Sequence, residues 1–112
     1  MNDAVILVTR YGMGSADEKL QLNLIAKYFE LFLQGGNLPA VICFYTDGVK
    51  LVCDGSPAIE QLQKLESLNV RLISCSTCLN YFGLQDKVRV GIVGGMGDIL
   101  EAQIQAEKVI SI

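Results

Sequence analysis

The chain has 112 residues, of which 51% are hydrophobic, and a formal net charge of −3. We therefore expect one folded domain over residues 1–112 rather than a disordered chain. The sequence has no run of Lys or Arg, no apolar stretch near the roughly 20 residues that span a bilayer, and no signal peptide in the short, acidic segment 1–9. These features indicate a cytoplasmic protein that binds neither nucleic acid nor membrane.

Five apolar runs predict β-strands. Continuous apolar runs are typical of strands that are buried on both faces of a parallel sheet. The runs are residues 4–8, 40–45, 70–73, 88–93 and 109–112. The segments between most of them carry helix or turn signals.

The first helix is predicted from Asp17 and Glu18, whose negative charge suits a helix N-terminus, to about Gln34. Glycines at 35 and 36 end it. Its apolar residues form two neighbouring stripes, which are Leu20, Leu24, Tyr28, Leu31 and Phe32, and then Leu22, Ile25, Phe29 and Leu33. This arc is wider than one core-facing stripe, and we therefore expect a homo-oligomer.

Two further helices have recognisable starts. A serine followed by proline opens a helix over residues 56–69. Asp98, with Glu101 three residues later, resembles a capping box for a helix that ends near Ala106. Residues 46–48 predict a turn, and residues 49–54 carry no clear helix or strand signal.

The alternation of strands and helices predicts an α/β fold with a parallel sheet and helices on both faces. Ligands bind outside the carboxyl ends of the strands in such sheets. The loops at 11–15, 46–48, 75–78 and 94–97 follow the first four strands. We therefore expect these loops to lie along one edge of the sheet and to form the functional site.

The C-S-T-C run from Cys75 to Cys78 is the principal candidate within this edge. The thiolate is the reactive form of cysteine, and a helix N-terminus favours it. We expect Ser76 or Thr77 to cap a short helical turn that puts both thiols on one face. The chain has no histidine, which removes the commonest general base and metal ligand.

Several uses of the two thiols remain open from the residues alone. One thiol could carry a sulfur atom as a persulfide, or the pair could cycle between dithiol and disulfide. Both could also be small buried hydrophobic residues. Zinc is the least favoured, because a structural site needs four ligands, Cys43 lies within a predicted buried strand and Cys53 stands alone. We predict reduced thiols, with no metal and no cofactor.

The glycine loops could bind a phosphate or another anion through backbone N–H groups. They match no nucleotide-binding motif, and tight turns or the close approach of another backbone explain them as well. The candidate residues for this role are Tyr11, Gly12, Gly14, Asp47 and Gly95. Arg10 and Lys50 are the nearest cations that could stabilise a thiolate or persulfide, and Tyr81 could also line the site.

The run L-I-S-C-S-T-C-L-N-Y-F-G-L resembles the signature of the DsrE/DsrF-like sulfurtransferase family. The likeness covers nearly the whole chain. It includes V-T-R-Y-G-M-G, F-Y-T-D-G-V-K-L and the closing A-E-K-V-I-S-I, and it is nearest to the DsrE-like domain of YedF-type proteins, which are associated with selenium metabolism.

This resemblance implies a three-layer α/β/α fold with a five-stranded parallel sheet, and sulfur transfer through a persulfide. The acting cysteine of the family stands directly after the third strand, which is the place of Cys75, while Cys78 corresponds to a second cysteine found in only some members.

The resemblance also implies partners. Members form dimers, trimers or hexamers and exchange sulfur with small carrier proteins of the TusA type. The chain begins at its first strand, without the carrier domain of YedF-type proteins, so we expect a separate sulfur donor. The alternatives are a dithiol–disulfide oxidoreductase and a non-enzymatic oligomeric module that binds a small ligand.

Overall fold

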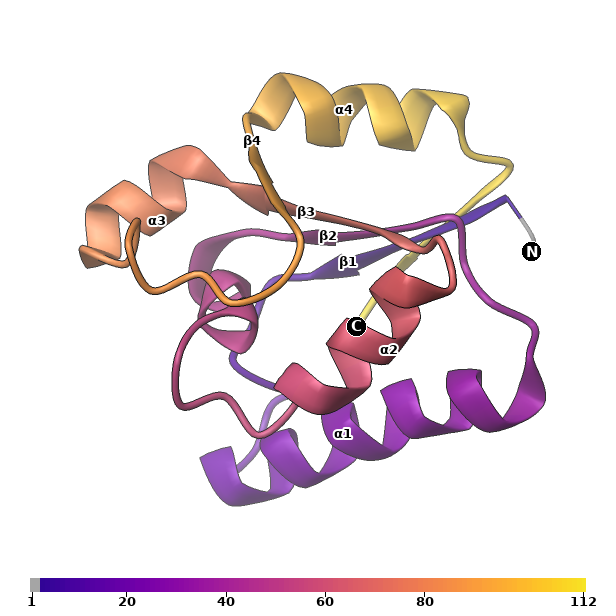
Figure 1. Ribbon diagram of the computed structural model, residues 1–112, viewed down its shortest axis with the longest axis horizontal. Coiled ribbons are helices and arrows are strands. Elements are labelled where there is room, and N and C mark those ends of the chain that lie inside the picture. Colours follow the sequence, from indigo (N-terminus) through magenta and orange to yellow (C-terminus); the bar gives the residue numbers. More distant parts are fainter. Residues whose placement is uncertain (1–2) are drawn as a thin grey trace.

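A computed structural model describes residues 3–112 as one sheet with helices packed around it (Figure 1). The strands are β1 (Ala4–Val8), β2 (Val41–Phe44), β3 (Arg71–Cys75), β4 (Ile92–Gly94) and β5 (Lys108–Ser111). The helices are α1 (Glu18–Gly35), the 3-10 helix η1 (Thr46–Val52), α2 (Ile59–Ser67), α3 (Ser76–Phe82) and α4 (Met96–Gln105).

All strand pairs in the five-stranded sheet are parallel, and the strand order is β4-β3-β2-β1-β5. Helices α1 and α2 cover one face of the sheet and α4 covers the other (Figure 1). The predicted α/β/α fold with a five-stranded parallel sheet is therefore confirmed. Because the strands are parallel, the segments that follow β1 to β4 all leave the same edge of the sheet.

The core lies on both faces of the central strands. Every residue of β1 and β2 is buried, as the continuous apolar runs predicted. The largest fully buried side chains come from α1, η1, α2, α3 and α4 as well as from the sheet, and they are Phe29, Phe44, Ile6, Ile25, Ile42, Leu51, Leu62, Leu65, Leu72, Ile73, Leu79 and Ile99. The strand ends at the functional edge are thus held by packing from several directions.

Helix α1 matches its prediction closely. The Asp17 carboxylate accepts a hydrogen bond from the Lys19 N–H at the start, and Gly36 ends the helix in the left-handed conformation. Of its two apolar stripes, the one that contains Ile25 and Phe29 faces the core. Leu20, Leu24 and Leu31 are exposed.

Several predicted boundaries were wrong. Helix α2 begins at Ile59, because the Ser56 hydroxyl accepts a hydrogen bond from the Ala58 N–H within a turn that precedes the helix. The residue at the start of α4 is Gly95, and its N–H donates to the Asp98 carboxylate; Asp98 is thus the third residue of the helix rather than its cap.

The fourth strand is shorter than the apolar run 88–93 suggested. Val88 forms an isolated antiparallel bridge with Cys53, and Gly91 has a left-handed φ of 80°. Gly91 also lies so close to β3 that a Cβ atom would stand 2.9 Å from the Leu72 carbonyl oxygen. The chain therefore joins the sheet only at Ile92.

None of the helices described is long and apolar enough to cross a membrane.

Candidate functional site

Cys75 is the last residue of β3 and also the residue that precedes the first turn of α3. Its backbone is extended, with φ −72° and ψ 119°, and its side chain caps no N–H group. The prediction that Ser76 or Thr77 would be the cap was therefore wrong. The residue is only 2% exposed, so its thiol lies beneath the surface at the carboxyl edge of the sheet.

Cys78 lies in the first turn of α3, three residues after Cys75, and is partly exposed. Its Sγ accepts a hydrogen bond from the Thr46 backbone N–H at 3.1 Å. Burial raises the pKa of the Cys78 thiol, the Thr46 hydrogen bond lowers it, and a hydrogen bond with Cys75 and the charge of that neighbour raise it again. No disulfide joins the two cysteines, and Cys75 lies close enough to Cys78 to affect the pKa of its thiol.

Thr46 is held in a conformation that few threonines adopt. Its φ is 49°, in the left-handed region, which is uncommon for a β-branched residue. Its hydroxyl is a shared donor to two backbone carbonyl oxygens, which are those of Thr9 at 2.6 Å and Tyr45 at 2.7 Å. The backbone N–H of Thr46 is thereby aimed at Cys78.

Gly48 explains how the start of η1 can lie against the end of β1. A Cβ atom at this position would overlap the carbonyl oxygen of Val8. Only glycine permits this approach, and it brings the turn that contains Thr46 to the cysteine pair. The glycine in the F-Y-T-D-G-V-K-L segment is thus required by packing.

The charged residues of the edge form a separate group next to the cysteines. The Lys50 ammonium lies 2.7 Å from the Asp47 carboxylate and 4.4 Å from the centre of the Phe82 ring, which belongs to α3. Burial and the charge of Glu18 raise the pKa of Tyr11, and Lys50 partly offsets them. Lys50 is therefore already paired, and a role for it at a thiolate stays a prediction.

A cavity of about 500 Å³ adjoins this charged group. It brings together four of the predicted residues, which are Arg10, Tyr11, Asp47 and Lys50. The cysteine pair is not part of its lining. Tyr81 is 83% exposed on α3 and takes no part in it.

The three glycines proposed as anion-binding residues occupy different settings. Gly12 has φ 130°, and a Cβ there would stand 2.5 Å from the Cβ of Gln21, so this glycine allows its loop to pack on α1. Gly14 has open space around it. The Gly95 N–H already donates to Asp98 at 2.8 Å. Anion binding at these loops stays a prediction.

The other two cysteines are apart from the pair. Cys43 is fully buried, as predicted, and burial raises the pKa of its thiol to about 11, with Arg71 partly offsetting the effect. Cys53 is buried and donates its S–H to the Val49 carbonyl oxygen at 3.3 Å. Within residues 3–112, no group of three or more Cys, Asp or Glu side chains is placed to hold a metal ion.

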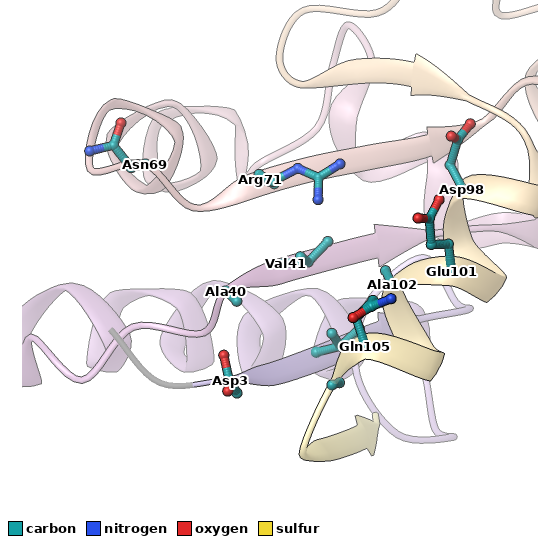
Figure 2. Close-up of a pocket in the computed structure, with 11 residues that line it drawn as sticks. Asp3, Ala40, Val41, Asn69, Arg71, Asp98, Glu101, Ala102 and Gln105 are labelled. Atoms are coloured by element: carbon teal, nitrogen blue, oxygen red, sulfur yellow. The ribbon is translucent and has the colours of Figure 1, made fainter.

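A cavity of about 410 Å³ lies along the face of the sheet that α4 covers (Figure 2). Its lining includes Arg71, Asp98 and Glu101, and Figure 2 shows the Arg71 side chain running along β3 toward the side of the two carboxylates. Arg71 begins the strand that Cys75 ends. The cavity extends from Arg71 to Asp98, whose carboxylate lies beside Gly94, the residue paired with Cys75. Neither thiol is part of its lining.

Comparisons with known proteins show the family of this chain and agree with its fold. The model of the DsrE/DsrF-like family matches residues 3–112. Among solved structures, the YchN protein from E. coli is similar with a TM-score of 0.74 and 21% identity, over 100% of both chains. A protein of unknown function from Methanobacterium thermoautotrophicum gives a TM-score of 0.71 at 19% identity, over 97% of both chains.

A conserved protein of unknown function from Bacteroides thetaiotaomicron is also similar, with a TM-score of 0.68 and 19% identity, over 98% of this chain and 95% of that one. No curated protein matches the sequence. Because these identities are low, the solved structures support the fold and say nothing about the function.

The fold and the site thus define an α/β protein with a thiol pair at the carboxyl edge of a parallel sheet. The chain belongs to the DsrE/DsrF-like family, whose members commonly act in sulfur relay.

Proposed function

We propose that this protein is a sulfur-relay protein that carries a persulfide on Cys75 and exchanges sulfur with a small carrier protein. The observation that carries the proposal is the placement of Cys75 at the carboxyl end of β3 and of Cys78 in the first turn of α3, where the Thr46 N–H donates to the Cys78 sulfur. Membership of a family that commonly acts in sulfur relay supports the same reading.

The chemistry requires no metal and no net oxidation. A thiolate attacks the terminal sulfur of a donor persulfide, a new S–S bond forms to the attacking cysteine, and the donor's S–S bond breaks. The donor leaves as a thiolate and takes up the proton that the attacking thiol gave up. The sulfur then leaves in the same way when an acceptor thiolate attacks it.

Burial suits Cys75 to store such a sulfur atom. Exposed low-pKa thiols are the ones most readily oxidised to sulfenic and sulfinic acids. Cys75 is 2% exposed, and oxidants in solution therefore have little access to it. A persulfide held there is protected between loading and delivery.

The experiment is to incubate the protein with hydropolysulfide, remove the excess, and record intact masses. We expect an increase of about 32 Da, the mass of one sulfur atom, that dithiothreitol reverses. The Cys53→Ser variant is the matched control, because it removes a buried thiol outside the pair and should load normally. No reversible adduct on the wild-type protein, or the same adduct on Cys75→Ser, would overturn the proposal.

The C-x-x-C spacing of the two cysteines at the start of α3 also favours a second candidate, a dithiol–disulfide oxidoreductase. This function requires both cysteines, whereas persulfide storage requires Cys75 alone. The Cys78→Ser variant separates the two. A variant that still holds reversible sulfur supports sulfur relay, and a variant that loses all thiol chemistry supports the oxidoreductase.

A homo-oligomer is part of the proposal. Exposed apolar side chains form a stripe on α4, and others lie on the adjoining edge strand β4; together they are Ile92, Val93, Met96, Leu100 and Ile104. An apolar strip beside an unpaired strand edge is typical of a contact between copies of a chain. The exposed leucines of α1 offer a second such surface.

A further inference from the structure

The two thiols of the pair differ in how exposed they are to solvent. Cys75 is 2% exposed and lies between the end of β3 and the start of α3, whereas Cys78 is partly exposed. A sulfur atom presented on the surface of another protein must approach within bonding distance of the attacking thiol. Cys78 permits that approach, and Cys75 does not without a movement of the surrounding chain.

Building on the sulfur-relay function proposed above, we propose that Cys78 is the thiol at which sulfur enters and leaves, and that sulfur passes between Cys78 and the buried Cys75 inside the protein. Cys78 is then a catalytic residue for exchange with a protein partner. Cys75 is the storage thiol.

Each step of this relay is a transfer of one sulfur atom between thiols. The Cys78 thiolate first attacks the terminal sulfur of the partner's persulfide, and the partner leaves as a thiol after it is protonated. The Cys75 thiolate then attacks the terminal sulfur of the Cys78 persulfide. A bond forms to Cys75, the Cys78 S–S bond breaks, and the proton of the Cys75 thiol passes to Cys78. The oxidation level of the pair is the same before and after the second step.

The two cysteines lie three residues apart, at the end of β3 and in the first turn of α3, so the proton has only a short way to pass between them. The Thr46 N–H, 3.1 Å from the Cys78 Sγ, stabilises the Cys78 thiolate that forms whenever sulfur enters or departs. Because the Thr46 hydroxyl is anchored by donation to backbone carbonyls of Thr9 and Tyr45, this donor is already in place before the reaction. Thr46 is accordingly a positioning residue for exchange at Cys78.

The experiment compares a small sulfur donor with a large one. Wild type, Cys78→Ser and the control Cys53→Ser are loaded either with hydropolysulfide or with persulfidated serum albumin, and the rate of persulfide formation is followed by mass spectrometry. For Cys78→Ser we expect loading by hydropolysulfide to persist at Cys75, while loading by albumin slows by roughly tenfold or more. Cys53→Ser should behave as wild type with both donors.

A Cys78→Ala variant controls for any effect of the serine hydroxyl. The melting temperatures of both Cys78 variants should equal that of wild type, which shows that they fold. Equal rates for wild type and both variants with albumin would overturn the proposal and leave persulfide storage at Cys75 standing. Formation of a Cys75–Cys78 disulfide with release of hydrogen sulfide would also overturn it. A wild-type protein that takes sulfur from neither donor would overturn both this inference and the proposed function.

Discussion

The backbone N–H of Thr46 donates a hydrogen bond to the Cys78 sulfur at 3.1 Å, although 32 residues separate the two in sequence. This bond joins the segment after β2 to the segment after β3. It makes the neighbourhood of the cysteine pair a product of the tertiary fold. A short C-x-x-C segment alone would lack this donor.

The Thr46→Val variant tests this relationship, because it keeps the branched shape and removes the hydroxyl. Without its hydroxyl donor, the turn loses hydrogen bonds worth about 1 kcal/mol and holds the N–H less firmly. We expect the pKa of Cys78 to rise further, so that alkylation by iodoacetamide at neutral pH slows. Thr46→Ser keeps the hydroxyl and should retain the wild-type rate; a slower rate in both variants would contradict this explanation.

Gly48→Ala should destabilise the fold, because the added methyl group would overlap the Val8 carbonyl oxygen. Overpacking of this kind costs about 1–3 kcal/mol, and each kcal/mol lowers the melting temperature of a domain of this size by about 4–8 °C. Thermal unfolding followed by circular dichroism measures the change. Gly35→Ala is the matched control: no atom lies within 4 Å of its added Cβ, and its melting temperature should be unchanged or higher.

The raised pKa of the buried Cys43 thiol predicts how the stability of the fold changes in alkaline solution. Burial raises the pKa of its thiol in the folded protein from 9.0 to about 11. Between these values the unfolded chain releases its proton and the folded chain keeps it, so the free energy of unfolding falls as the pH rises from 9 to 11. The loss is on the order of 2 kcal/mol. Urea titrations of wild type and Cys43→Ala should show a flatter pH dependence for the variant, and parallel curves would contradict the assignment.

The exposed stripe on α4 gives a prediction about assembly. Leu100 is 54% exposed between Met96 and Ile104, and a charge there should be unfavourable within an apolar contact. Light scattering should find wild type larger than a monomer and Leu100→Glu smaller than wild type. Leu24→Glu on α1 tests the other exposed surface in the same way. A monomeric wild-type protein would remove the homo-oligomer from the proposal.

Much of the fold could be predicted from the sequence, because each buried parallel strand is encoded by a continuous run of apolar residues. Residues 4–8 match β1 in full, and α1 begins and ends within one residue of its prediction. The boundaries of β4 could not be predicted. Its apolar run includes Val88, which bridges to Cys53, and the left-handed Gly91, and both are consequences of contacts with distant segments.

The site was predictable in part for the same reason. The end of the third strand placed Cys75 at the carboxyl edge of the sheet, and the structure agrees. The role of Thr46 was missed, because every residue except proline has a backbone N–H and the residue type does not reveal where that group points. A T-D-G segment by itself predicts only a turn. Gly48 was predicted as part of a turn, but its close approach to β1 depends on a distant segment and could not be predicted. The predicted Arg10, Tyr11 and Asp47 do lie together, around a cavity whose lining does not include the thiols.

The location of the loaded sulfur tests the central claim most directly. Trypsin places Cys75 and Cys78 on one peptide, residues 72–87, and leaves Cys43 and Cys53 on two others. After loading with hydropolysulfide and trapping, fragmentation of that peptide assigns the added sulfur to one cysteine. We predict that it resides on Cys75 and disappears when an acceptor thiol is added. Sulfur that resides on Cys78, Cys43 or Cys53, or sulfur on Cys75 that an acceptor thiol does not remove, would contradict the account.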